Sequence, residues 1–195
     1  MRISKYGQLR RAASGFAKGT AKNLAIVGAP GVGKTETIVR LLRHSPHVIV
    51  RGRKSAIDFY VQLFLNRDKL IILDDAEGLL ADPAGRELVR DLTEHVGIKT
   101  LRWGTQSRVL TSKGVPSEFD TRSRLLILTN RLQAGDITEA ISNRVLALTF
   151  EPSWVEVYRH ACKWVRDQEI LDFVCPSVRR RWPRRGACRS PRGCR

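Results

Sequence analysis

Long apolar runs are absent from this sequence of 195 residues, and their absence limits where the chain is expected to work. No run approaches the roughly 20 apolar residues that a membrane-spanning helix requires. The first 20 residues carry Arg and Lys but lack the apolar stretch of a secretory signal. We therefore expect a cytoplasmic protein with no membrane partner.

Cysteine is scarce as well, with four residues, and none of them forms a Cys-x-x-Cys pair. No pair of histidines has the spacing of zinc ligands either. The sequence therefore argues against a structural zinc site. The expected state of the cysteines is a reduced thiol in each case, at Cys162, Cys175, Cys188 and Cys194.

Acidic residues are missing from both ends of the chain, and this explains most of the formal net charge of +16. Residues 1–22 contain six basic residues and residues 176–195 contain eight arginines, which leaves +2 for the middle. Basic segments of this kind bind phosphate backbones without reading sequence, so nucleic acid is an expected partner. The alternative is that both ends are solvated arms, because blocks of like charge are commonly disordered.

Apolar runs and helical patterns alternate along the middle of the chain. Strands are expected at 24–27, 48–50, 70–73, 125–128 and 145–150, and helices at 33–45, 57–64, 83–96, 136–143 and 154–165. Residues 100–111 are β-like, residues 112–122 are expected to form a loop, and residues 1–22 a flexible lead-in. Strands that alternate with helices predict an α/β fold with a parallel sheet.

One glycine-rich run carries a recognisable chemistry. Gly28-Ala29-Pro30-Gly31-Val32-Gly33-Lys34-Thr35 has the spacing Gly-x4-Gly-Lys-Ser/Thr, between an expected strand and an expected helix. The glycines let the backbone curl around a phosphate, and the helix start adds the positive end of its dipole. Lys34 is expected to reach the β- and γ-phosphates and Thr35 to ligate magnesium. The motif predicts binding of ATP, or a close nucleoside triphosphate, with Mg2+.

Acidic residues follow the third expected strand. Asp74 comes directly after the apolar run 70–73 and is the expected magnesium ligand. Asp75 is the expected residue that orients or deprotonates the attacking water. Hydrolases of this type usually have Glu there, and Glu77 is a nearby substitute.

Two further residues complete the candidate site. Asn130 follows the fourth strand and is expected to contact the γ-phosphate or hold the attacking water, although Asn is also a common turn former. Arg144 precedes the fifth strand and is a candidate arginine finger for a neighbour's nucleotide. Its more ordinary alternative is a surface or salt-bridge role.

In this order, the P-loop (28–35), Asp74-Asp75, Asn130 and Arg144 resemble the Walker A, Walker B, sensor 1 and arginine-finger elements of AAA+ ATPases. The resemblance covers roughly residues 20–175. It implies a P-loop NTPase with an AAA+ core: a five-stranded parallel sheet in the AAA+ strand order, flanked by helices, with an abbreviated C-terminal helical lid. It also implies a homo-oligomer, such as a ring. Residues 114–119, which run into 125–130, resemble ATPases of phages and plasmids.

The resemblance divides the chain into a basic N-terminal segment (1–22), an ATPase core (23–150), a partial lid (151–175) and an Arg-rich tail (176–195). AAA+ lids carry a sensor-2 arginine above the nucleotide, and Arg179 is the candidate for it. The short lid departs from the family pattern.

The leading functional hypothesis is an ATPase that couples hydrolysis to remodelling or movement on nucleic acid or a nucleoprotein complex. In this hypothesis Trp103, beside Arg102, stacks on bases; the alternative is that Trp103 packs in the core. Three other functions remain open: a superfamily 3-type helicase, a nucleotide-dependent switch or scaffold with little hydrolysis, and a small-molecule kinase.

Overall fold

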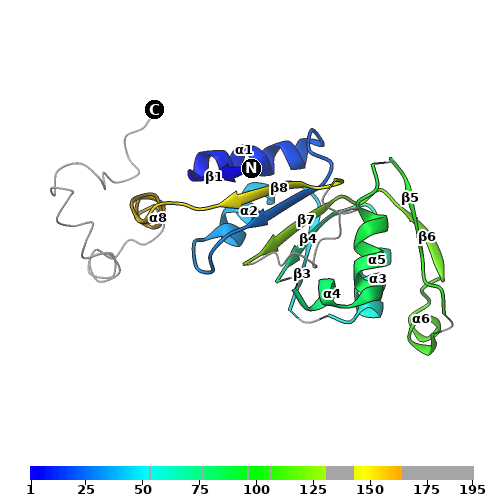
Figure 1. The fold of residues 1–195 in the computed structure, drawn as a ribbon. Coiled ribbons are helices and arrows are strands. Elements are labelled where there is room, and N and C mark those ends of the chain that lie inside the picture. The colour runs from blue at the N-terminus through cyan, green and yellow to red at the C-terminus, as the bar shows by residue number, and fades with distance from the viewer. Residues whose placement is uncertain (53, 76, 96, 106, 131–142, 164–195) are drawn as a thin grey trace.

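The computed structural model describes residues 1–163 apart from 53, 76, 96, 106 and 131–142. Its centre is a six-stranded sheet in the order β1-β8-β2-β7-β4-β3 (Figure 1). These strands are β1 (Arg2–Ile3), β2 (Leu24–Val27), β3 (His47–Arg51), β4 (Leu70–Asp74), β7 (Leu125–Thr129) and β8 (Leu146–Phe150). All neighbouring strands in this sheet run parallel, so they end at one edge.

The expected fold class is confirmed, with one strand more than expected. The P-loop strand β2 lies between β8 and β7, and β4 and β3 follow beyond β7. This is the strand order that the AAA+ resemblance implies. The extra strand is β1, which lies beside β8 and pairs Arg2 with Thr149 and Ile3 with Phe150.

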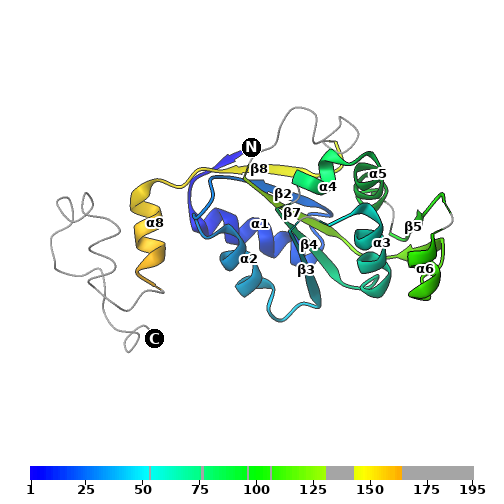
Figure 2. The ribbon, with the colours of Figure 1, turned by 90° about the horizontal axis from the view of Figure 1, so that it is seen from below.

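Helices cover both faces of the sheet (Figures 1 and 2). One face carries α1 (Tyr6–Lys18) and α2 (Lys34–Leu42), and the other carries α3 (Ala56–Leu65), α4 (Glu77–Ala81) and α5 (Pro83–Leu92). Alternate strand residues serve the two layers: Leu24 and Ile26 pack with α1 and α2, whereas Ala25 packs with α3 to α5. The near-continuous apolar strands follow from this burial on both faces.

The expectation of a flexible N-terminal segment is wrong. Tyr6, Leu9, Ala13 and Phe16 are at most 3% exposed, and their spacing of three and four residues is that of one helix face. Alanine, glycine and serine residues in this segment weaken the apolar helical pattern, so the sequence did not predict the helix. The Gln8 side chain accepts hydrogen bonds from the backbone N–H groups of Ser4 and Lys5, so the helix start is capped.

An antiparallel hairpin occupies the region between α5 and β7. It consists of β5 (Lys99–Arg102) and β6 (Glu118–Thr121), with the short helix α6 (Arg108–Ser112) between them. The expected β-like stretch is therefore correct for β5 and wrong for α6, and the expected loop 112–122 contains β6. Leu101 and Phe119 pair across the hairpin and point into the core, which gives two short strands a buried face.

The C-terminal part of the described chain ends in α8 (Trp154–Ala161), where the sequence predicts a helix. Ser153 caps it by accepting a hydrogen bond from the N–H of Glu156. The helix expected at 136–143 lies almost wholly outside the described residues, as do Arg179 and the tail 176–195. Within the described ranges, no helix has the length and apolar character needed to cross a membrane.

A stability measurement tests whether residues 1–22 belong to the folded domain. Phe16 is fully buried, so Phe16→Ala should lower the free energy of unfolding by about 3–5 kcal/mol, because it leaves a cavity. Arg11→Ala on the exposed side of the same helix should change it by less than about 0.5 kcal/mol. Denaturant titration provides both values. A small effect of Phe16→Ala would mean that α1 is not part of the cooperative unit.

Candidate functional site

The P-loop connects the end of β2 to the start of α2. Gly31 and Gly33 have φ values of 75° and 72°, which L side chains rarely adopt, so glycine is needed at both positions. A Cβ on Gly28 would lie 2.5 Å from the backbone oxygen of Phe150 in β8. The glycines therefore serve both the curl of the loop and its close approach to the neighbouring strand.

Lys34 turns back over the loop that precedes it. Its Nζ donates hydrogen bonds to the backbone oxygens of Gly28 at 2.6 Å and Ala29 at 2.8 Å, and to Oδ1 of Asn130 at 3.1 Å. Burial lowers the pKa of Lys34, against the opposing effect of Asp74, Asp75 and Glu77. The ammonium group thus satisfies its donors within the loop, next to where a phosphate would bind.

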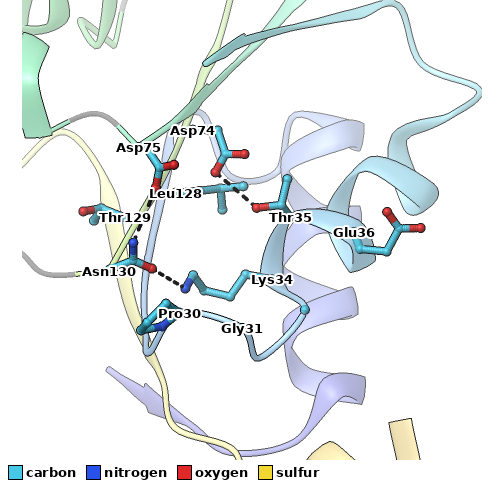
Figure 3. A pocket seen from close by; sticks show the side chains of 11 residues that line it. Pro30, Gly31, Lys34, Thr35, Glu36, Asp74, Asp75, Leu128, Thr129 and Asn130 are labelled. Carbon is cyan, nitrogen blue, oxygen red and sulfur yellow. Dashed lines mark hydrogen bonds between the residues drawn. The ribbon is translucent and has the colours of Figure 1, made fainter. Parts of the chain in front are cut away.

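Thr35 and Asp74 form the candidate magnesium site. The hydroxyl of Thr35 donates to Oδ1 of Asp74 at 3.1 Å, so two oxygen ligands from α2 and β4 lie together (Figure 3). Hydroxyl and carboxylate oxygens are ligands that Mg2+ accepts, and the residues present fit this ion. Nε of Arg51, at the end of β3, lies 3.2 Å from Oδ2 of Asp74 and partly neutralises the same carboxylate.

Asp75 and Asn130 lie together at the same edge of the sheet. Nδ2 of Asn130 donates to Oδ1 of Asp75 at 3.4 Å, while its Oδ1 accepts from Lys34 (Figure 3). Asp75 has a φ of 60°, the one described non-glycine residue in the left-handed region. Such a conformation costs about 1–3 kcal/mol for most residues and is common at functional sites. Asn130 therefore bridges the P-loop lysine and the candidate water-activating carboxylate.

Glu77 lies where it supports the end of β7, and not where a substitute for the water-activating Asp75 would lie. Its Oε1 accepts hydrogen bonds from the hydroxyl of Thr129 at 2.8 Å and from the N–H of Asn130 at 3.4 Å. Burial alone would raise the pKa of Glu77, but these hydrogen bonds and nearby Lys34 outweigh it, so the net shift is downward. The ionised carboxylate holds the end of β7, and with it Asn130, in position.

These residues surround one cavity of about 400 Å³. Its lining includes the P-loop, Asp74, Asp75 and the end of β7 from Leu128 to Asn130. This cavity has one ammonium group, the carboxylates of Glu36, Asp74 and Asp75, and a helix N-terminus. Such a set suits an anionic ligand bound with a divalent cation. Among the residues that the structure describes, it thus brings together every candidate site residue except Arg144.

Arg144 lies just before β8, at the sheet edge opposite to the carboxyl ends of the strands. Its Nη1 donates to the backbone oxygen of Arg90 at 3.1 Å and lies 3.6 Å from Oε1 of Glu94. A second cavity, lined by residues of α1, His95 and Arg144, lies there. Arg144 therefore lies away from the cavity at the P-loop of its own chain.

Helices α1 and α8 meet at the P-loop through a stacked aromatic pair. The Tyr6 ring lies parallel to the His160 ring, with centroids 3.7 Å apart and an interplanar angle of 4°. The Tyr6 hydroxyl donates to the backbone oxygen of Val32 at 2.6 Å, and Nε2 of His160 lies 3.1 Å from the Thr37 hydroxyl. Both helices therefore fix the P-loop and the first turn of α2.

Three residues of this region were missed in the sequence. Arg51 ends β3 as Asp74 ends β4. The rule that parallel strands end at one edge would therefore have identified Arg51 as a residue of the site. Tyr6 and His160 gave no signal of this kind, because they are far apart in the sequence and only the fold brings them into contact.

Trp103 packs against the core with its ring centroid 5.6 Å from that of Tyr60, which favours the core alternative.

The Tyr6–His160 pair predicts a specific loss of stability in acid. Burial, then the cations Arg10, Lys163 and Arg40, lower the pKa of His160 from 6.5 to about 4. An unfolded histidine takes up its proton near pH 6.5, so this residue's contribution to stability is complete above pH 6.5 and is lost as the pH falls towards 4.

The loss should appear as a lower midpoint of denaturation at pH 5.0 than at pH 7.5. His160→Phe retains an aromatic ring for the stack but cannot be protonated, so it should show a smaller difference between the two pH values. Glu156, which lies near Tyr6 and helps to raise its pKa, stays the same in both proteins. Equal pH dependence in the two proteins would exclude His160 as the source.

Comparisons with known proteins find only a low similarity to solved structures. No protein-family model matches the sequence, and no curated protein matches it. A chain from a structure of katanin self-assembly is 13% identical with a TM-score of 0.46, covering 83% of this chain and 56% of that one. A DNA polymerase III gamma subunit-related protein from Thermotoga maritima is 13% identical with a TM-score of 0.47, covering 89% and 53%.

This chain thus spans little more than half the length of either solved chain. Neither likeness is close enough to assign an activity. The strand order of the sheet, with the P-loop after β2, Asp74 after β4 and Asn130 after β7, is independent of them. The chain thus has an α/β fold in the strand order that the AAA+ resemblance of its motifs implies.

Proposed function

We propose that this chain is an AAA+ ATPase that binds ATP with Mg2+ and hydrolyses it. The observation that carries the proposal is the convergence of Lys34, Thr35, Asp74, Asp75 and Asn130 on one cavity. They come from three elements that are distant in the sequence, so an incidental glycine-rich turn would not explain their meeting. A kinase would need a second pocket for an acceptor beside this one.

The geometry gives each side chain a role. Lys34 leaves the carbonyl oxygens of Gly28 and Ala29 and turns to the phosphates, whose negative charge replaces those acceptors. Thr35 and Asp74 would hold magnesium, which would supply positive charge next to the phosphate oxygens. Asn130 orients the attacking water, and Asp75 accepts its proton.

One specific observation favours a second function, a nucleotide-dependent switch with little hydrolysis. Asp75 is one methylene shorter than the usual Glu, and it is tied to Asn130 at 3.4 Å in this structure. A short carboxylate that is held by its neighbour reaches the attacking water less easily. The chain would then bind ATP tightly and turn it over slowly.

We further propose that the chain works as a homo-oligomer on nucleic acid or a nucleoprotein complex. The position of Arg144, at the sheet edge opposite to its own site, supports a role as an arginine finger towards a neighbouring copy. Its bonds to Arg90 and Glu94 would hold it until a neighbour is present. The basic composition supports nucleic acid as the partner.

Magnesium-dependent ATP hydrolysis, measured with and without single-stranded DNA, tests the proposed activity. Lys34→Ala should abolish ATP binding and turnover, because it removes the cation that meets the phosphates. Asp75→Asn should retain ATP binding and lower turnover at least about 100-fold, because it removes the proton acceptor. DNA should raise the turnover of the wild-type protein.

Asp75→Glu separates the ATPase from the switch. If the short side chain limits hydrolysis, this variant should turn over ATP faster than the wild-type protein. ATP binding without turnover in the wild-type protein, restored in Asp75→Glu, would favour the switch. Absence of ATP binding in the wild-type protein would overturn both functions.

Arg51 should compete with magnesium for Asp74. Arg51→Ala should lower the Mg2+ concentration that half-saturates binding of a fluorescent ATP analogue by about two- to fivefold, because the partly exposed ion pair contributes little energy. Arg67→Ala, another exposed arginine, is the matched control and should leave it unchanged. A higher magnesium requirement in Arg51→Ala would mean that Arg51 supports the bound nucleotide instead.

A further inference from the structure

Basic side chains gather on the outward side of α1 and α2. The two helices lie side by side on one face of the sheet (Figures 1 and 2). Helix α1 has no acidic residue, and α2 has one, Glu36. The basic face consists of the exposed residues Arg10, Arg11 and Lys18 of α1 with Arg40 and Arg43 of and after α2.

One end of this face lies near His160. Arg10, Arg40 and Lys163 come from different parts of the chain, yet each acts on His160 and disfavours its protonation. Cations that share one surface repel one another, and a bound polyanion relieves the repulsion. The positive potential is therefore a property of the folded surface and not of one sequence run.

Both ends of α1 are tied to the rest of the fold. The Tyr6 hydroxyl bonds Val32 in the P-loop at one end. At the other end, Arg124 donates hydrogen bonds to the backbone oxygens of Phe16 and Ala17. A helix fixed in this way displays its cations at set positions, and Arg10 and Lys18 lie about 12 Å apart along its axis. That length spans roughly three to four phosphates of one strand.

We propose that the basic face binds the phosphodiester backbone of nucleic acid, alongside the P-loop. The proposal rests on the nucleic-acid role in the proposed function and names the surface that performs it. Its occupant is a polyanion and not a membrane, because the apolar residues of α1 are buried in the core. Tyr6, Leu9, Ala13 and Phe16 leave no apolar side to enter a bilayer.

The position of the basic face also separates it from the other candidate surface, the β5–β6 hairpin. On the outward side of the hairpin, Arg102 pairs with Glu118 at 2.7 Å and Thr100 bonds Asp120. The ion pair neutralises Arg102, the carboxylate of Asp120 adds negative charge, and Trp103 is packed against the core. The hairpin therefore presents less positive charge to a phosphate backbone than α1 does.

The test compares two charge-matched double variants of the full chain in nucleotide-free solution. Arg11→Gln with Lys18→Gln removes two cations of the basic face, and Arg108→Gln with Lys113→Gln removes two exposed cations of and after α6. Binding to a fluorescent single-stranded oligonucleotide is measured over a range of salt concentrations. The arginines of 176–195 are the same in every protein, so the differences report the two surfaces alone.

We expect the α1 variant to bind about tenfold more weakly at low salt. Its plot of log affinity against log salt should be shallower by about 0.7 for each lost phosphate contact. The α6 variant should keep the wild-type affinity and slope. Unchanged ATP binding by the α1 variant would show that its nucleotide site is intact, and circular dichroism that it is folded.

The proposal is overturned if the α1 variant binds DNA like the wild-type protein, or if the α6 variant carries the loss. It is also overturned if the α1 residues matter for vesicles containing phosphatidylserine and not for DNA. Because the assay contains no nucleotide, failure of this prediction does not count against the proposed ATPase activity. Conversely, a chain that hydrolyses no ATP can still show the expected dependence on Arg11 and Lys18.

Discussion

The site depends on the parallel course of the strands in the central sheet. Because β2, β3, β4 and β7 all end at one edge, the residues that follow them meet there. The register makes this concrete: Arg51 pairs with Asp74, and Asp74 with Leu128, two residues before Asn130. An antiparallel strand in this set would have sent one of these side chains to the opposite edge, about 15 Å away.

Charge balance explains how acidic and basic side chains lie together at this edge. Lys34 is nearly buried, and Asp74, Asp75 and Glu77 surround it with negative charge. Each group has a partner within the chain: Asp74 has Arg51 and Thr35, and Glu77 has Thr129. The residues that would bind phosphate and metal thus bond one another, and a ligand replaces bonds instead of filling a site of unsatisfied groups.

Much of this arrangement could be predicted from the sequence, and the reason is periodicity. Runs such as Leu70–Leu73 are buried on both faces, so they stand out, and the polar residue after each run marks the functional edge. The rest could not be predicted because its signals are weak or non-local. Alanine and glycine weaken the apolar pattern of helix α1, and β6 is too short to show alternation. The Tyr6–His160 stack joins residues that are 154 positions apart in the sequence.

Helix α1 connects the two proposed functions. Its inner side forms part of the core and donates the Tyr6 hydroxyl to the P-loop, while its outer side carries Arg10, Arg11 and Lys18. A nucleic-acid strand bound to the outer side would therefore contact a helix that is itself hydrogen-bonded to the backbone of Val32. Any shift of α1 by bound nucleic acid must either move that carbonyl or break a 2.6 Å hydrogen bond. Val32 lies between Gly31 and Gly33, whose backbone sets the curl of the P-loop. The proposed binding of nucleic acid would therefore be coupled to the proposed nucleotide site through one buried tyrosine.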